Sequence, residues 1–326
     1  MRTVLIRTDG DHSLGMGHVY RSVSIADEIR RRRFGTVIVT KSRGLDRVIP
    51  RRHRIRRITG SPGSIRRAVR EEDPAVSVID KLEVGTEELK ILAAGSSTVG
   101  IDYTGKNKRL LGRGINMLYQ RTGLSGRNSF SGFEYTVLNR RMAGLGPIRV
   151  SKDVRRVLVM QGGADTYCYT PAIIRALGDV PGRFTVGVVA GISFKCWREL
   201  DAAIAGSPHR VRTYHNAKNM GPIMSGSDMA VTAGGVSSLE LCHLGVPSVI
   251  VCGESFEAET ASLLQGRGFG TSLGFRRAPS RRKIAAAVEG LMKDHARRRS
   301  MNRAGRALVD GRGTERTVDR ILEVAG

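Results

Sequence analysis

The sequence is poor in aromatic residues and has no long apolar run. Phenylalanine, tryptophan and tyrosine together make up 5% of its 326 residues, so the basic stretches lack the interleaved aromatics on which single-stranded nucleic acid stacks. No apolar stretch approaches the roughly 18 residues that span a bilayer, which predicts a chain without a transmembrane segment. The N-terminus also lacks a hydrophobic region followed by a small-residue cleavage site, so we expect a cytoplasmic protein.

Cysteine is scarce as well. The four cysteines, Cys168, Cys196, Cys242 and Cys252, are scattered and show no CxxC spacing. This pattern supports neither a zinc site nor a framework of disulfides. We therefore expect reduced, mostly buried thiols, no bound metal and no cofactor.

Basic residues greatly outnumber acidic ones, and the formal net charge is +24. Much of the excess lies in arginine clusters at residues 30–34, 51–57 and 297–299. Such a surface attracts nucleic acid, anionic lipid or a phosphorylated substrate. Because no helix-turn-helix, zinc-finger or RNA-recognition pattern is present, no specific nucleic-acid partner is expected. A solvated surface is the simplest interpretation, and peripheral contact with an anionic membrane is the alternative.

Short apolar runs alternate with helical patterns along the chain, which predicts an α/β fold with parallel sheets and crossover helices. A polar segment with glycine and proline, "GLGPIRVSKD" at 144–153, divides the runs into two similar sets. We therefore expect two Rossmann-like domains, at residues 1–146 and 147–326. The expected strands are Val4–Arg7, Thr36–Thr40, Val76–Ile79, Thr98–Ile101, Arg156–Met160, Thr185–Ala190, Met229–Thr232 and Ser248–Val251.

The first glycine-rich turn, "DGDHSLGMGHVYRS", lies between a predicted strand and a helix that runs to Ile29. Open α/β sheets bind ligands at such turns. His18 stands at the helix start, where the positive end of the helix dipole disfavours the imidazolium and favours a neutral general base. Gly15 and Gly17 allow close approach of a substrate. Arg21, one turn later on the same face, is placed to hold a phosphate or a carboxylate.

An aspartate pair, Asp9 and Asp11, follows the first predicted strand directly. Metal-dependent sugar transferases use a D-x-D pair, but they do not carry it straight after the first strand. We interpret these residues as turn residues, and we assign Asp9 beside His18 to the catalytic group.

The stretch "TAGGVSSLELCHLG" contains the second glycine-rich turn, in which a strand ends before Gly234 and Gly235 and a helix begins near Ser237. The backbone N–H groups of such a helix start, including those of Ser237 and Ser238, form an anion site suited to a pyrophosphate. Glu240 is then placed to hold two ribose hydroxyls. The alternative is structural, because Ser237 and Glu240 also have the spacing of a capping box.

A third turn, "VLVMQGGADTY" at 157–167, follows the first strand of the second set. Its Gly162–Gly163 pair allows a close backbone approach, and we assign both glycines to the substrate site.

These motifs resemble a known family. "DGDHSLGMGHVYRSVSIADEI" is similar to the N-terminal motif D-x-S-x-x-I-G-x-G-H-x-x-R-x-x-x-L-A of the UDP-sugar hydrolases of the pseudaminic acid pathway. The likeness continues in order through "VIDK" (78–81), "GIDY" (100–103), "GFEYTVLNRRM" (132–142) and "GRGTERTVDRIL" (311–322). The second glycine-rich turn is shared more widely with GT-B glycosyltransferases, including the peptidoglycan N-acetylglucosaminyltransferases.

The resemblance implies a GT-B fold, in which two Rossmann-like domains with parallel sheets face a central cleft and the second binds most of the nucleotide. It implies that His18 activates a water molecule, which attacks the anomeric carbon of a UDP-activated amino-sugar and releases UDP and the free sugar with inversion. The implied reaction is that of a UDP-2,4-diacetamido-2,4,6-trideoxy-altropyranose hydrolase, in nonulosonic-acid or surface-glycan biosynthesis. The resemblance also favours Glu240 as a ribose ligand and implies that the reaction requires no metal.

Two departures from the family pattern lie at the substrate end. The family has D-x-Y where this chain has D-K-L at 80–82, and it has an Asn-Gln pair where this chain has "CGESFEAETA" (252–261), with Glu257 or Glu259 nearest that place. We assign Asp80 and Glu257 to the substrate site. The alternative function is an inverting GT-B glycosyltransferase with a UDP-sugar donor and a sugar or lipid-linked acceptor. A nucleic-acid-binding protein that has lost catalysis is the third interpretation.

Overall fold

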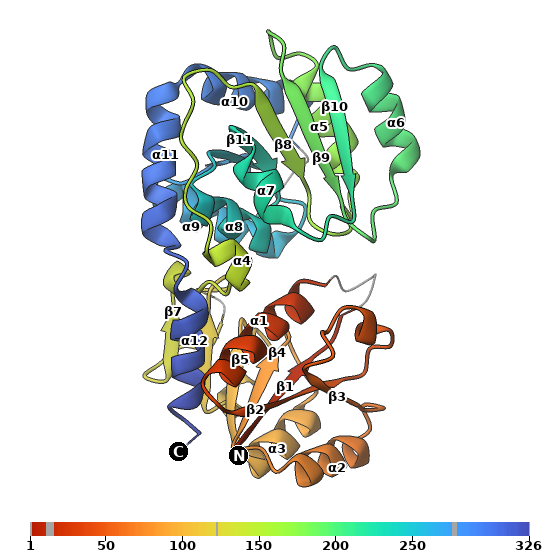
Figure 1. Cartoon of the computed structure of the whole chain (residues 1–326), viewed down its shortest axis with the longest axis vertical. Helices are drawn as coiled ribbons and strands as arrows, with labels where there is room; N and C mark the ends of the chain where they lie inside the picture. The colour runs from red at the N-terminus through yellow and green to blue at the C-terminus, as the bar shows by residue number, and fades with distance from the viewer. Residues whose placement is uncertain (1, 11–15, 122, 276–278, 326) are drawn as a thin grey trace. The chain divides into compact units, whose positions relative to one another are not determined.

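The computed structural model describes residues 2–10, 16–121, 123–275 and 279–325. They form two compact units, each built on a parallel sheet (Figure 1). Unit 1 consists of Met1–Arg140 and Gly311–Gly326, and unit 2 is Arg141–Asp310. The predicted α/β class with two parallel-sheet domains is confirmed.

The sheet of unit 1 has seven strands in the order β3-β2-β1-β4-β5-β6-β7, all parallel to their neighbours. Side chains alternate between its faces, as the period of a strand requires. In β1, Val4 and Ile6 enter one hydrophobic cluster and Leu5 enters another. The strands are β1 (Thr3–Thr8), β2 (Gly35–Thr40), β3 (Arg54–Arg57), β4 (Val76–Asp80), β5 (Ser97–Ile101), β6 (Arg113–Asn116) and β7 (Ser129–Ser131).

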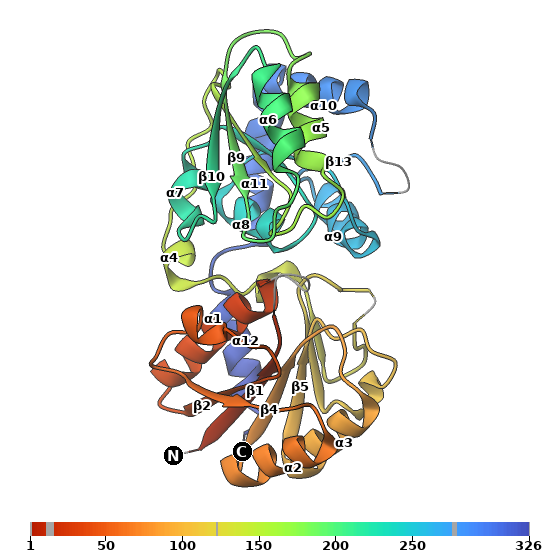
Figure 2. The ribbon, with the colours of Figure 1, turned by 90° about the vertical axis from the view of Figure 1, so that its right-hand side faces the viewer.

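Helices cover both faces of this sheet, since both faces are apolar. Helices α1 (Gly17–Arg31) and α12 (Gly313–Leu322) pack on one face, and α2 (Pro62–Glu72) and α3 (Thr86–Gly95) pack on the other (Figure 2). The connections also contain short 3₁₀ helices at Leu45–Arg47, Lys108–Leu110 and Phe133–Tyr135.

The C-terminal helix α12 belongs to unit 1, although the sequence analysis placed residues up to 326 in the second domain. Val318 and Ile321 of α12 are fully buried in the same cluster as Val19 and Ile25 of α1. Gly313 begins the helix against Thr136, where a side chain would overlap the backbone. The chain therefore passes between the units twice, near α4 (Arg140–Ala143) and again before Gly311.

The sheet of unit 2 has six parallel strands in the order β10-β9-β8-β11-β12-β13. Its strands are β8 (Arg156–Met160), β9 (Thr185–Ala190), β10 (Arg210–His215), β11 (Met229–Thr232), β12 (Ser248–Ile250) and β13 (Thr271–Ser272). Its helices are α5 (Tyr169–Leu177), α6 (Trp197–Ala205), α7 (Met220–Ser225), α8 (Val236–Leu244), α9 (Ser255–Gly266), α10 (Arg281–Lys293) and α11 (His295–Leu308).

All eight predicted strands are present, and the strands that were missed lie mainly at or near sheet edges. β3 has the sequence RIRR and β10 has RVRTYH, and both are mostly solvent-accessible. Charged side chains on edge strands discourage pairing with other chains, and they also remove the apolar signal that reveals a strand. The arginine cluster at 51–57 thus contains a strand, and Arg54, Arg56 and Arg57 form ion pairs with acidic side chains of unit 1.

Candidate functional site

In each unit the strand order reverses once, and ligands of open α/β sheets bind beyond the carboxyl ends of the strands at that point. In unit 1 the reversal lies between β1 and β4, whose last paired residues are Thr8 and Asp80. In unit 2 it lies between β8 and β11, whose last paired residues are Met160 and Thr232. The glycine-rich turns of the sequence analysis follow these strands.

A histidine–aspartate pair occupies the reversal point of unit 1. His18 Nδ1 lies 2.9 Å from Oδ1 of Asp80, the last residue of β4. Asp80 is fully buried, whereas about a quarter of the His18 side chain, 26%, is exposed. Nη2 of Arg21 lies 3.0 Å from the same ring nitrogen. When Nδ1–H donates to the buried carboxylate of Asp80, Nε2 is the unprotonated nitrogen. In that tautomer His18 is an oriented base with a partly exposed side chain.

Arg21 holds the aspartate of this pair in place. Its guanidinium contacts Asp80 Oδ1 at 2.5 Å and Asp102 Oδ2 at 2.5 Å, and Ser22 Oγ donates to Asp80 Oδ2 at 2.9 Å. Burial alone would raise the pKa of Asp80, but the charge of Arg21 and the hydrogen bond of His18 lower it to about 2. Arg21 is itself buried, so its contacts are with these carboxylates and do not leave it open to a substrate phosphate.

Asp102 and Ser22 are members of this cluster that the sequence analysis did not assign. Asp102 follows β5 and accepts backbone bonds from Met117 at 2.8 Å and Leu118 at 2.9 Å, besides its ion pair with Arg21. Its place after a predicted strand, within the "GIDY" segment, is the signal that could have identified it. Asp80, assigned to the substrate, contacts the histidine and the arginine.

Asp9 lies in a separate ion-pair cluster. Arg7 Nη1 contacts Asp9 Oδ1 at 2.6 Å, and Lys81 Nζ contacts Oδ2 at 2.6 Å. Burial alone would raise the pKa of Asp9, but the hydrogen bond and the charge of Arg7 hold it below its usual value. Arg7 is fully buried and also pairs with Glu88 of α3 at 2.6 Å. Both oxygens of Asp9 are thus engaged by basic side chains, which fits a structural role for this carboxylate.

Of the two glycines assigned to the first turn, Gly17 is the first residue of α1 and Gly15 lies outside the described residues. A methyl group on Gly17 would meet no atom of the described residues within 4 Å.

The second turn has a steric reason for its glycine pair. A Cβ on Gly234 would lie 2.5 Å from the carbonyl oxygen of Glu257, so only glycine fits there. Gly235 is the N-cap of α8 and no side chain caps this helix start. Among the described residues, the N–H groups of Val236 and Ser237 are therefore left for a ligand, as an anion site requires. The N–H of Ser238, which was also assigned to this site, instead donates to the carbonyl oxygen of Gly235 at 3.0 Å.

The capping box expected between Ser237 and Glu240 is absent, and this interpretation was wrong. The helix begins at Val236, one residue earlier than expected, so Ser237 lies inside the first turn and Glu240 lies beyond it. Ser238 is buried and donates its hydroxyl hydrogen to the carbonyl oxygen of Gly235 at 2.7 Å.

Glu240 therefore does not cap α8. Its carboxylate forms no ion pair or hydrogen bond with the other described residues. Burial raises its pKa to about 7. A partly buried carboxylate that lacks partners has unused acceptor capacity, and two neighbouring hydroxyl donors would satisfy it.

A capping box does exist at the next helix, and it uses Glu257. Glu254 is the N-cap of α9, and Glu257 is the N3 residue whose carboxylate accepts backbone bonds from Gly253 at 2.8 Å and Glu254 at 3.3 Å. The backbone N–H of Gly234 also contacts this carboxylate. Glu257, which was assigned to the substrate, thus joins the β12–α9 loop to the glycine turn before α8.

The third turn is held by neighbouring loops. Gly162 has a left-handed φ of 71°, and a side chain on Gly191 would overlap the backbone of Gly163. Cys168 and Cys196 form a disulfide between the loops that follow β8 and β9, which corrects the expectation of reduced thiols at these two positions. Their spacing of 28 residues carries no recognisable motif, so only the fold brings them together. Cys242 and Cys252 are free and buried.

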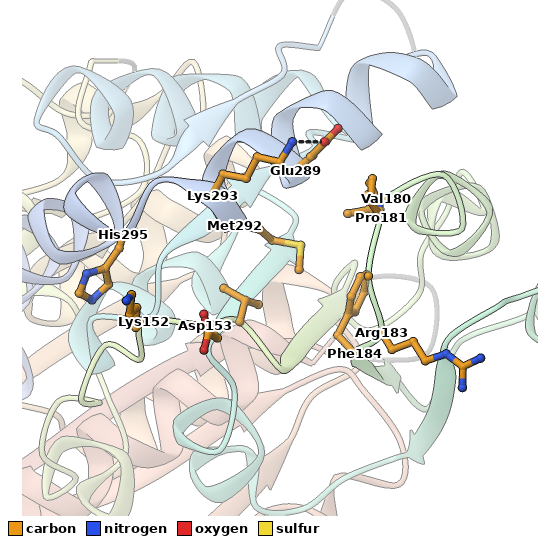
Figure 3. A pocket seen from close by; sticks show the side chains of 12 residues that line it. Lys152, Asp153, Val180, Pro181, Arg183, Phe184, Glu289, Met292, Lys293 and His295 are labelled. Atoms are coloured by element: carbon orange, nitrogen blue, oxygen red, sulfur yellow. Dashed lines mark hydrogen bonds and ion pairs between the residues drawn. The ribbon is translucent and has the colours of Figure 1, made fainter.

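A cavity of about 430 Å³ lies at the other end of the unit 2 sheet (Figure 3). It is lined by residues 152–154 before β8, by residues 180–184 before β9, and by the junction of α10 and α11. Lys293 and Glu289 on its wall pair with each other at 2.5 Å. Because it adjoins the amino ends of β8 and β9, this cavity is separate from the glycine turns.

The described residues contain no group of three or more His, Cys, Asp or Glu side chains arranged to hold a metal ion. Within the same residues, no helix has both the length and the apolar character needed to cross a membrane.

Sequence comparisons identify distant relatives, and no protein-family model matches the chain. The spore coat polysaccharide biosynthesis protein SpsG of Bacillus subtilis is 23% identical over an alignment of length 345, gaps included, which covers 98% of this chain and 97% of SpsG. An uncharacterized protein of Methanocaldococcus jannaschii, MJ1062, is 23% identical over 287 residues. That alignment covers 78% of this chain but 57% of MJ1062, so the chain spans little more than half of that relative.

Solved structures share the fold over nearly the whole chain. MurG of Acinetobacter baumannii superposes with a TM-score of 0.76 at 13% identity, covering 99% of this chain and 100% of MurG. HepE of Anabaena, solved in complex with UDP and glucose, gives a TM-score of 0.66 at 14% identity and covers 99% of each chain. The two parallel-sheet domains are thus those of the GT-B glycosyltransferase fold.

Proposed function

We propose that this protein is an enzyme that cleaves the C1–oxygen bond of a UDP-activated amino-sugar, with water as the acceptor, in the biosynthesis of a nonulosonic acid or another surface glycan. The observation that carries the proposal is the contact of 2.9 Å between His18 Nδ1 and the buried Asp80. This pair supplies an oriented base at the place where α/β folds bind ligands. The name of SpsG, a polysaccharide biosynthesis protein, supports the pathway class.

In the proposed reaction, His18 Nε2 accepts a proton from water as the water oxygen forms a bond to the anomeric carbon. The bond between that carbon and the phosphate oxygen breaks at the same time, and its electron pair leaves with UDP. Attack opposite the leaving group inverts the configuration. Asp80 accepts the Nδ1–H bond throughout and stabilises the imidazolium that forms.

Unit 2 is assigned the nucleotide. The open N–H groups at the start of α8, near Gly235 and Ser237, would receive the diphosphate and stabilise its developing charge. Glu240 would accept hydrogen bonds from the two ribose hydroxyls, and these would be partners for a carboxylate that has none among the described residues. The UDP bound in HepE, which has the same fold, supports this ligand class.

A second candidate is an inverting glycosyltransferase with the same donor and a sugar or lipid-linked acceptor. It is favoured by Leu82, which stands where the hydrolase family has a tyrosine, and by the glycosyltransferase fold. The basic surface would then lie against anionic lipid.

The deciding experiment incubates the protein with a panel of UDP-amino-sugars and measures UDP and free sugar separately, with His18→Asn as the control. Equal yields of UDP and free sugar without an acceptor are expected for the hydrolase. UDP release that requires an added acceptor would show a transferase. If neither product forms and the protein binds DNA but not UDP, both enzyme assignments are wrong.

A further inference from the structure

Two stacked tyrosines stand where the loop after β8 leads into α5: Tyr167 lies in the loop and Tyr169 is the first residue of the helix. The ring centroids of Tyr167 and Tyr169 are 5.8 Å apart and the rings are inclined by 29°. Tyr167 is 51% exposed, so part of its ring is available to a ligand. Exposed apolar surface beside a ligand turn commonly contacts the ligand.

The loop holds these rings in a fixed place. Asp165 accepts backbone bonds from Tyr169 at 2.8 Å and from Thr170 at 2.8 Å, which closes the start of α5. Cys168, the residue between the two tyrosines, is covalently linked to Cys196 on the neighbouring loop. A rigid aromatic surface loses little conformational entropy when a ligand binds to it.

The tyrosine pair lies next to the glycine turn assigned to the diphosphate. A Cβ on Gly253 would lie 3.2 Å from the Tyr167 ring, so the ring packs against the bare backbone of the β12–α9 loop. Tyr167 Oη also donates to Glu254 Oε2 at 3.4 Å. The backbone N–H of Gly253 is bonded to Glu257, whose own backbone touches Gly234. The aromatic surface is thus one loop away from the start of α8.

The place of the tyrosine pair beside the start of α8 indicates which part of the ligand it contacts, and this inference rests on the proposed function. If the diphosphate is bound at α8, the group attached to its outer phosphate is the sugar. A tyrosine face packs well on the C–H face of a pyranose ring, and it offers no partner to a sugar hydroxyl directed at it. We infer that the Tyr167–Tyr169 stack is the surface on which the donor sugar rests, and that it selects amino- and deoxy-sugars over fully hydroxylated ones.

The test uses titration calorimetry on the full chain in a His18→Asn background, so that the sugar is not cleaved. The ligands are UDP, UDP-N-acetylglucosamine and UDP-glucose, and the variants add Tyr167→Ala or Tyr167→Phe. Tyr167→Ala is expected to weaken UDP-N-acetylglucosamine binding by roughly twofold to tenfold, the usual range for an aromatic contact. Its UDP affinity is expected to remain unchanged. Tyr167→Phe keeps the ring and is expected to bind both ligands as the parent does.

The outcomes separate the inference from the proposed function. If Tyr167→Ala weakens UDP as much as the UDP-sugar, the ring contacts the nucleotide and the sugar surface is wrong. If neither affinity changes, or if UDP-glucose is preferred, the inference also fails while the proposed function stands. If the parent binds no UDP, the proposed function fails and the inference with it. Melting curves of each variant show that it is folded.

Discussion

His18 and Asp80 are 62 residues apart in the sequence, yet their side chains meet at 2.9 Å between the start of α1 and the end of β4. The parallel pairing of β1 with β4 creates this contact, because it brings the carboxyl end of β4 beside the turn that leads into α1. Asp80 also binds Arg21 and Ser22 from the same helix. One buried carboxylate therefore fixes both the base and the helix that carries it.

His18→Asn should remove most turnover and leave nucleotide binding intact. Asparagine lacks a base, and a general base contributes about 10²–10⁴-fold to a rate. The expected result is a fall in kcat of that order, with the Kd for UDP within twofold of the parent. Steady-state kinetics and calorimetry measure the two quantities. Near-normal kcat would mean that the histidine has only a structural role.

Asp80→Asn should reduce both activity and stability, because it removes the charge that faces His18 and Arg21. Loss of one partner from a buried ion pair costs about 3–5 kcal/mol. Ser22→Ala is the matched control, since it removes one hydrogen bond to Asp80 and leaves the contact with His18. Denaturant unfolding and kcat are measured for both. Equal loss of kcat in the two variants would contradict the assignment of Asp80 as the residue that positions His18.

Glu240 should make stability depend on pH. Its pKa is about 7 in the folded protein against an ordinary value of 4.5, so the folded state keeps a proton that the unfolded chain has lost. The free energy of unfolding therefore decreases as the pH rises from about 4.5 to 7, because the folded state binds more protons than the unfolded chain over this range. Glu240→Gln is uncharged throughout. Without ligand, the variant is expected to melt above the parent at pH 8 and together with it at pH 4.5.

The same substitution tests the ribose contact. UDP affinity should fall by roughly 1.5–3 kcal/mol in Glu240→Gln at pH 8, the usual contribution of hydrogen bonds to a charged group. The difference in UDP affinity between parent and variant should be smaller at pH 6, because the parent carboxyl is mostly protonated there. If the difference in UDP affinity between parent and variant is the same at pH 6 and pH 8, or if there is no difference, Glu240 does not bind the ribose.

The disulfide between Cys168 and Cys196 should contribute measurably to stability. In the chain-entropy model, a disulfide that closes a loop of 28 residues raises the free energy of unfolding by about 3–4 kcal/mol. Dithiothreitol is expected to lower the free energy of unfolding by that amount, and Cys168→Ser should show no response to the reductant. Thiol titration of the denatured, unreduced protein should find only Cys242 and Cys252 free. Four reactive thiols would show that the bond does not form.

The placement of α12 in unit 1 predicts where a C-terminal substitution acts. Ile321 is fully buried, and Ile321→Ala should cost about 2–5 kcal/mol. The single tryptophan, Trp197, lies in unit 2 and reports on that unit alone. Thermal unfolding followed by circular dichroism should therefore gain an early transition that Trp197 fluorescence does not show. If both the circular dichroism signal and the Trp197 fluorescence shift, the assignment of α12 to unit 1 is contradicted.

The sequence predicted the elements that carry strong local signals. Apolar β-branched runs identified the buried strands, and the glycine turns after strands coincide with the points at which the strand order of each sheet reverses. Charged edge strands such as β3 gave no such signal. The partner of His18 also escaped detection, because Asp80 reaches it only through the pairing of β1 with β4. The alternative capping role of Glu240 rested on spacing alone, and it is excluded because α8 begins one residue earlier than predicted.

The double passage of the chain between its units has a consequence for synthesis on the ribosome. Residues 1–140 of unit 1 emerge before unit 2, but the core of unit 1 lacks Val318 and Ile321 until α12 has been translated. Unit 2 is one continuous segment and can fold in the meantime. At about 5–20 residues per second, translation from residue 140 to 311 takes about 10–30 s. During that interval the nascent first unit exposes the apolar surface that α12 later covers, so it is the stage at which a chaperone is most needed.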